Sequence, residues 1–118
     1  MTAINNILDC IKDMRGLPLD YDGFDNDISV SINSALMALN QIGIGKHGFQ
    51  VVDGTETWED FIGEDYPYFA GVKQFVYYSV LLGFDPPSNS FLVKNIEDRL
   101  QELTWRLNVQ AETPSWKV

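Results

Sequence analysis

A helix-length stretch of almost unbroken apolar sequence, residues 67–83, lies in the second half of the chain. Its apolar residues occupy all sides of a helix, which is typical of a helix surrounded by other helices. They are Tyr68, Phe69, Val72, Phe75, Val76, Tyr78, Val80, Leu81 and Leu82. The stretch is about one turn shorter than a membrane span, and it contains Lys73 and Gln74. We therefore expect a soluble intracellular protein with this helix in the middle of a bundle.

A sharp break follows this helix at Asp85-Pro86-Pro87. A residue before proline avoids the α-helical region, so Asp85 is predicted to leave the helix, and Pro87 extends the break. One of the polar residues 88–90 can then cap a last helix over residues 88–110. That helix carries an apolar stripe at spacings of three and four residues: Leu92, Ile96, Leu100, Leu103 and Leu107. The two helices are predicted to form a tight hairpin, with the leucine stripe lying along the apolar helix.

Two more helices are predicted in the first half of the chain. Residues 2–15 form one apolar stripe, and Gly16 follows where a helix end is expected. Asp25 or Asn26 can cap a second helix that ends before Gly43. The stripe of the first helix consists of Ile4, Ile7, Leu8, Ile11 and Met14. The second helix is predicted to bury Ile28, Ile32, Ala35, Leu36 and Leu39.

Residues 48–61 break the helical period and match a short β-hairpin. Its strands are predicted at residues 49–52 and 55–57, joined by a type I′ turn at residues 53–54, which are Asp-Gly. Thr57 and Asp60 can then cap one helical turn.

These elements fit one domain, since a chain of 118 residues buries roughly two thirds of its unfolded surface. We expect an all-α, four-helix bundle-like domain over residues 1–110, with a small β-hairpin between helices two and three. Residues 111–118 are expected to form a C-terminal tail. The single cysteine, Cys10, excludes an internal disulfide framework and a cysteine-rich zinc site. It lies next to the apolar face of the first helix and is predicted to pack there.

The net charge of −9 is concentrated in one segment. Residues 20–65 hold ten acids and one base, Lys46, whereas the remainder holds seven acids and seven bases. A phosphate-binding surface needs clustered Lys and Arg, and the sequence has no such cluster. We therefore expect the protein to repel a DNA backbone and not to grip it.

Two local patterns are candidate functional sites: an acidic cluster as a calcium site, and the single histidine as a catalytic residue. Four carboxylates lie close together after Leu19: Asp20, Asp22, Asp25 and Asp27. An EF-hand register that starts at Asp20 fails, because Phe24 takes a ligand position, and carboxylates near a helix N-terminus need no metal to explain them. His47, the only histidine, lies in a Gly-rich loop without a nucleophile motif. We predict no catalysis, no cofactor and no metal.

The order of these features resembles the head-tail connector (adaptor) family of long-tailed bacteriophages and prophages. In that family an Asp-Pro-Pro turn precedes a helix that ends in a Trp-Arg-Leu-Asn-Val type of run. Here the turn is Asp85-Pro86-Pro87 and the run is residues 105–109. Residues 32–63 also resemble the family's second helix and its Gly-Phe and Thr-Trp loop. The resemblance covers about residues 2–110.

The resemblance implies a structural virion protein of the phage neck, assembled in the cytoplasm of the host bacterium. Its expected partners are further copies of itself in a ring of twelve-fold symmetry, the portal protein, and a stopper or tail-completion protein. The ring would join the portal vertex of the DNA-filled head to the tail. DNA would pass through its channel without specific binding, and no membrane would be involved.

The last helix has a second apolar face, formed by Phe91, Trp105 and Val109. On a helical wheel at about 100° per residue, these three fall within about 40° of one another, on the far side from the leucine stripe. Two interpretations stay open. The face is buried within the fold, or it meets another subunit, since aromatic residues are enriched at interface hot spots and a ring needs two different faces.

The acidic segment allows two functional interpretations. In a ring, Asp20, Asp22, Asp25 and Asp27 would border the channel. The alternative is an acidic DNA mimic or small inhibitor that binds a basic partner. The apolar face of the last helix distinguishes the two, because a monomeric mimic has no use for an exposed apolar patch.

Overall fold

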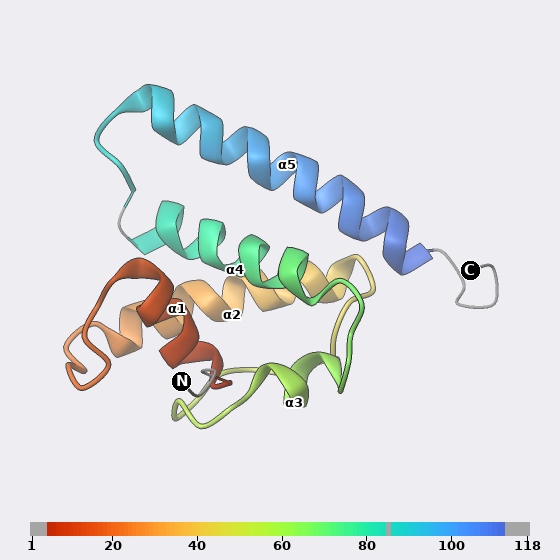
Figure 1. The fold of residues 1–118 in the computed structure, drawn as a ribbon, viewed down its shortest axis with the longest axis horizontal. Helices are drawn as coiled ribbons and strands as arrows, with labels where there is room; N and C mark the ends of the chain where they lie inside the picture. Colours follow the sequence, from red (N-terminus) through yellow and green to blue (C-terminus); the bar gives the residue numbers. More distant parts are fainter. Residues whose placement is uncertain (1–4, 85, 113–118) are drawn as a thin grey trace.

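The computed structural model describes residues 5–84 and 86–112. In chain order they form α1 (Ile7–Arg15), α2 (Asp25–Gln41), α3 (Trp58–Ile62), α4 (Phe69–Phe84) and α5 (Ser90–Glu112). α4 contacts α1, α2 and α5, and it lies between α2 and α5 (Figure 1). The all-α class and the central position of the apolar helix are therefore confirmed. Among the described residues, no helix combines the length and apolar character needed to cross a bilayer.

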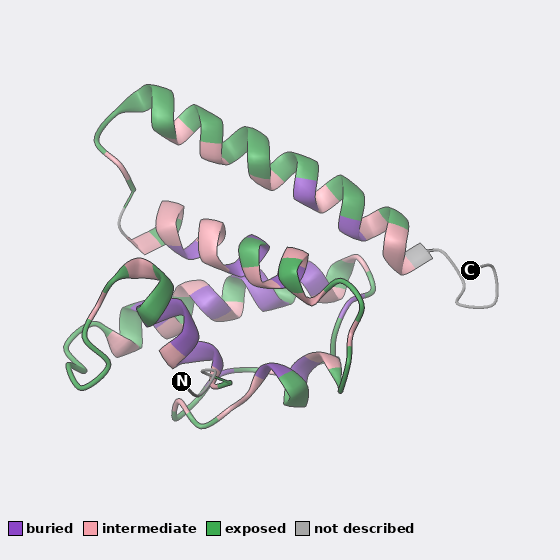
Figure 2. Ribbon diagram, in the orientation of Figure 1, coloured by how far each residue is buried: buried purple, intermediate pink, exposed green. Residues whose placement is uncertain are grey.

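The core forms where α1 and α2 meet α4. The predicted stripe of α2 is confirmed in full, since all five of its residues are buried. It packs in one apolar cluster with Val72, Val76 and Val80 of α4 and with Ile7 and Ile11 of α1. Figure 2 shows buried segments on α1, α2 and α4, where the three helices meet.

α1 is shorter than predicted. It begins at Ile7, and residues 2–4 of the predicted helix lie outside the described part of the chain. Asn6 is extended and pairs with Thr57 in an antiparallel bridge. Its carbonyl oxygen accepts the first hydrogen bond of α1, from the N–H of Cys10 at 2.9 Å. The Asn5 carbonyl accepts the N–H of Trp58 at 3.1 Å, so the chain before α1 is also held to a distant loop. The predicted end at Gly16 is confirmed: Gly16 adopts a left-handed conformation at φ 82°, which glycine favours.

A buried lysine connects α1 to the acidic loop that follows it. The Lys12 side chain is 2% exposed. Its Nζ donates hydrogen bonds to the carbonyl oxygens of Leu19 at 3.2 Å and Tyr21 at 2.7 Å, and to Oδ1 of Asp25 at 2.8 Å. All three of its donors are therefore used, and its charge is compensated.

The prediction that Asp25 or Asn26 caps α2 is wrong. Phe24 occupies the cap position, and no side chain there bonds to the helix backbone. The carboxylate of Asp25 faces Lys12 instead. Asp25 is therefore a structural counter-ion.

The predicted β-hairpin is also wrong, since residues 48–57 form no strand ladder. A type I′ turn needs positive φ at both central residues, and only Gly54 has it, at 86°. The Glu56 carboxylate accepts hydrogen bonds from the backbone N–H groups of residues 52, 53 and 54. Asn33 on α2 bonds both the N–H and the carbonyl of Val51. Because side chains satisfy this backbone, no partner strand is required.

The helical turn after the loop is confirmed. The backbone N–H of Asp60 donates to Thr57 Oγ1 at 3.1 Å, and that of Thr57 donates to Asp60 Oδ2 at 3.2 Å. This capping box starts α3, which buries Trp58 and Phe61.

α5 runs antiparallel to α4 but packs on it only over its second half (Figure 1, Figure 2). Along the leucine stripe, Leu92 is 49% exposed, whereas Leu107 is 3% exposed. Asn89 is the cap, because its Oδ1 accepts the N–H of Phe91 at 2.8 Å. Asp85 of the predicted turn lies outside the described residues. α5 also continues to Glu112, beyond the predicted helix end at residue 110.

Candidate assembly surfaces

The second apolar face predicted for the last helix is exposed on α5, and it consists of two separate parts. Phe91, Trp105 and Val109 are all exposed in the isolated chain, so the described part of the fold does not cover them. Phe91 and Trp105 lie 14 positions apart in sequence, about 21 Å along the helix axis. Two charged pairs lie along this part of α5: Lys94 with Asp98 at 3.1 Å, between the two aromatic residues, and Glu102 with Arg106 at 2.9 Å, which spans Trp105. Trp105 and Val109 therefore form one surface, and Phe91 belongs to another.

Trp105 and Val109 border a groove of about 510 Å³ between α5 and the start of α4. On the α4 side it is lined by Tyr68, which is exposed, and by Gly71. A Cβ atom at Gly71 would lie 3.3 Å from Leu107 Cδ2, so the glycine permits α5 to approach α4 closely at this point. We name this region, Tyr68, Trp105 and Val109 with the groove between them, the α5 surface.

A second exposed apolar region lies on α2 and was missed from the sequence. Val30 and Met37 are exposed and seven residues apart, so they share one helix side. They line a groove of about 500 Å³ with Gln41 and with residues 47–50 of the following loop. We name Val30, Met37 and this groove the α2 surface. The signal was present, since a spacing of seven on the polar side of an amphipathic helix is visible in the sequence.

The four acids after Leu19 do not act as a set. Asp20, Asp22 and Asp27 are exposed, whereas Asp25 is paired with Lys12. Within the described residues, no group of three or more His, Cys, Asp or Glu side chains is arranged to hold a metal ion.

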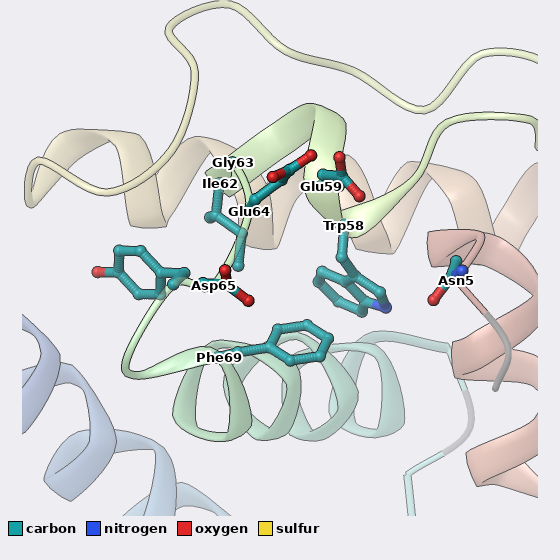
Figure 3. A pocket seen from close by; sticks show the side chains of 9 residues that line it. Asn5, Trp58, Glu59, Ile62, Gly63, Glu64, Asp65 and Phe69 are labelled. Atoms are coloured by element: carbon teal, nitrogen blue, oxygen red, sulfur yellow. The ribbon is translucent and has the colours of Figure 1, made fainter.

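A second acidic region surrounds a pocket of about 490 Å³ between α3 and α4 (Figure 3). The Trp58 and Phe69 rings meet edge to face at 5.7 Å beside it. Protonated Glu59 donates a hydrogen bond to the Glu64 carboxylate, and this bond, together with the negative charge of Glu64, raises the pKa of Glu59. The protonated carboxyl is therefore favoured in the folded protein, and this contact weakens as the pH rises through the raised pKa of Glu59. The acids around this pocket, Glu59, Glu64 and Asp65, belong to the acidic segment of residues 20–65.

Cys10 and His47 occupy different environments. Cys10 is buried in the core, which confirms its predicted packing, whereas His47 is exposed in the loop after α2.

The family of the chain follows from comparison with known proteins. A family model described as phage connector protein matches residues 7–114, a range that contains all five described helices. A search of curated proteins and a search of solved structures each found no match. The family match confirms the resemblance found in the sequence and makes the protein a structural component of a phage particle. The chain belongs to the phage connector protein family.

Proposed function

We propose that this protein forms a ring in the phage neck, joining the portal vertex of the head to the stopper or tail. The observation that carries this proposal is the α5 surface. Trp105 is 66% exposed on the half of α5 that packs against α4, beside an apolar groove. A large aromatic side chain exposed in this way is typical of an interface anchor. In a connector protein, the partners for such a surface are other neck subunits and the portal.

The charge distribution supports a channel that lets DNA slide. The acids of residues 20–65 give DNA phosphates no attractive partner. Several bases are already engaged: Lys12 is buried against Asp25, while Lys94 and Arg106 pair with acids on their own helix. In the proposed ring, which assembles in the host cytoplasm and has twelve-fold symmetry on the portal, the exposed acids border the channel.

The same surface argues against a monomeric DNA mimic. A mimic presents acids to a basic partner and gains nothing from an exposed tryptophan, which promotes association in water. The acidic segment alone fits both functions, whereas the exposed α5 surface supports the ring.

Electron microscopy tests the proposal directly. We expect the purified protein, mixed with its cognate portal protein, to add a ring-shaped layer to the portal. Portal particles without an added layer, at protein concentrations well above those of the particles, would contradict it.

A charge-removal variant tests the channel. Changing Asp20, Asp22 and Asp27 to Asn is expected to leave ring assembly unchanged and to slow DNA ejection, because less negative charge repels the passing phosphates. Ejection kinetics from purified phage particles measure the effect. Asp25→Asn is the matched control: it disturbs the Lys12 pair, so it is expected to lower thermal stability. Unchanged ejection by the triple variant would remove these acids from the channel.

A further inference from the structure

We propose that subunits join head to tail, with Trp105 of one subunit inserted into the α2 surface of the next. This inference rests on the proposed ring, and it adds which two surfaces form each joint. Its basis is the presence of two unlike apolar surfaces on one subunit, together with the distribution of charge between them.

The two surfaces lie on the outer sides of α2 and α5, although the C-terminal ends of these helices approach each other, since a Cβ atom at Gly43 would lie 3.7 Å from Ala111 Cβ. α4 lies between α2 and α5 (Figure 1). Val30 and Met37 lie opposite the buried stripe of α2, and Trp105 lies opposite the buried stripe of α5. A closed ring requires this arrangement, because each subunit must offer one face to the subunit before it and a different face to the subunit after it.

The groove of the α2 surface has the chemistry to receive an indole. Val30 and Met37 provide apolar contact, and methionine sulfur packs favourably against aromatic rings. Phe49 also lines the groove and is half-buried. Three of its polar residues, Gln41, His47 and Gln50, are exposed. They can supply an acceptor for the indole N–H, which needs one when it is buried. At about 500 Å³, the groove has space for the ring of a tryptophan.

Charge favours this pairing over a symmetric one. The α2 surface belongs to residues 20–65, which carry the whole net charge of −9. A two-fold contact between α2 surfaces would bring two such segments together, and like charges across an interface are unfavourable. Residues 66–112, which include the α5 surface, hold four bases and five acids. A head-to-tail joint therefore places the acidic segment against a nearly neutral one.

Chemical cross-linking tests the pairing. Ser34 and Val109 are exposed at the two surfaces, and Ser34 lies more than two helical turns from the point where the ends of α2 and α5 meet. The native Cys10 is buried. We expect the double variant Ser34→Cys/Val109→Cys, treated with a short bis-maleimide, to give a ladder of covalent oligomers in denaturing gels. Each single variant and the parent protein should remain monomeric. Cross-linked dimers from either single variant, or the absence of a ladder from the double variant, would overturn the proposal.

A mixing experiment tests the direction of the joint. Trp105→Ala and Met37→Glu each disable one half of it, so each variant alone should fail to form rings on the portal. Mixed in equal amounts, they retain one intact Trp105 and one intact α2 surface, and they should form a heterodimer in sedimentation velocity. Melts followed by circular dichroism check that both variants are folded. Rings formed by Met37→Glu on the portal would overturn this inference and leave the proposed function standing, whereas a lack of rings from the unmodified protein would count against the proposed function itself.

Discussion

Replacing Lys12 by alanine is expected to lower the free energy of unfolding by about 3 kcal/mol or more, because breaking a buried ion pair by removing one partner commonly costs that much. The change leaves Asp25 without its counter-ion and the carbonyl oxygens of Leu19 and Tyr21 without their donor. Each buried acceptor left unsatisfied adds a penalty of its own. Urea denaturation measures the total, and hydrogen exchange should show residues 17–24 opening before the core.

Lys94→Ala is the matched control for this experiment. Lys94 also pairs with an aspartate, at 3.1 Å, but both side chains are more than half exposed. An exposed pair one helical turn apart contributes about 0.5 kcal/mol or less. Equal losses for the two variants would show that Lys12 does not organise the acidic loop.

Replacing Trp105 by glutamine is expected to abolish rings while leaving the monomer folded. Trp105 is largely exposed, and exposed substitutions commonly change stability by about 0.5 kcal/mol or less. Truncating a tryptophan at the centre of an interface commonly costs about 2 kcal/mol or more. This corresponds to about a thirtyfold weaker binding constant at each joint. Because every joint of a closed ring is weakened, assembly should fail cooperatively, and phage heads carrying the variant should leak DNA.

Trp58→Gln is the matched control for Trp105→Gln, because the same substitution is expected to destabilise the monomer at position 58. Trp58 is 3% exposed in the core, and loss of a buried tryptophan costs about 3–5 kcal/mol. Circular dichroism melts should therefore show a large drop for Trp58→Gln and almost none for Trp105→Gln. If Trp105→Gln unfolds the monomer, Trp105 belongs to the core and the interface must lie elsewhere.

The sequence by itself determined the features that depend on neighbours in the chain. Helix periodicity located α2 and its buried stripe, and the apolar stretch at residues 67–83 was identified as the central helix. Local chemistry gave the capping box of Thr57 and Asp60 and the helix end at Gly16. The order of these local signals was also sufficient to identify the family. All of them are encoded within a few residues, where spacing and side-chain chemistry decide the outcome.

Only the tertiary structure decided the features that depend on distant residues. The loop at residues 48–57 has the sequence of a hairpin, but Asn33 on α2 binds its backbone and removes the need for a strand. The position and residue type of Asp25 predict a helix cap, but its carboxylate pairs with Lys12 instead. The leucine stripe of α5 is uniform in sequence, but α4 covers only its second half, as Leu107 and Leu92 show. In each case a long-range contact replaced the local preference, because a partner that is distant in sequence supplied the hydrogen bond, the charge or the apolar cover.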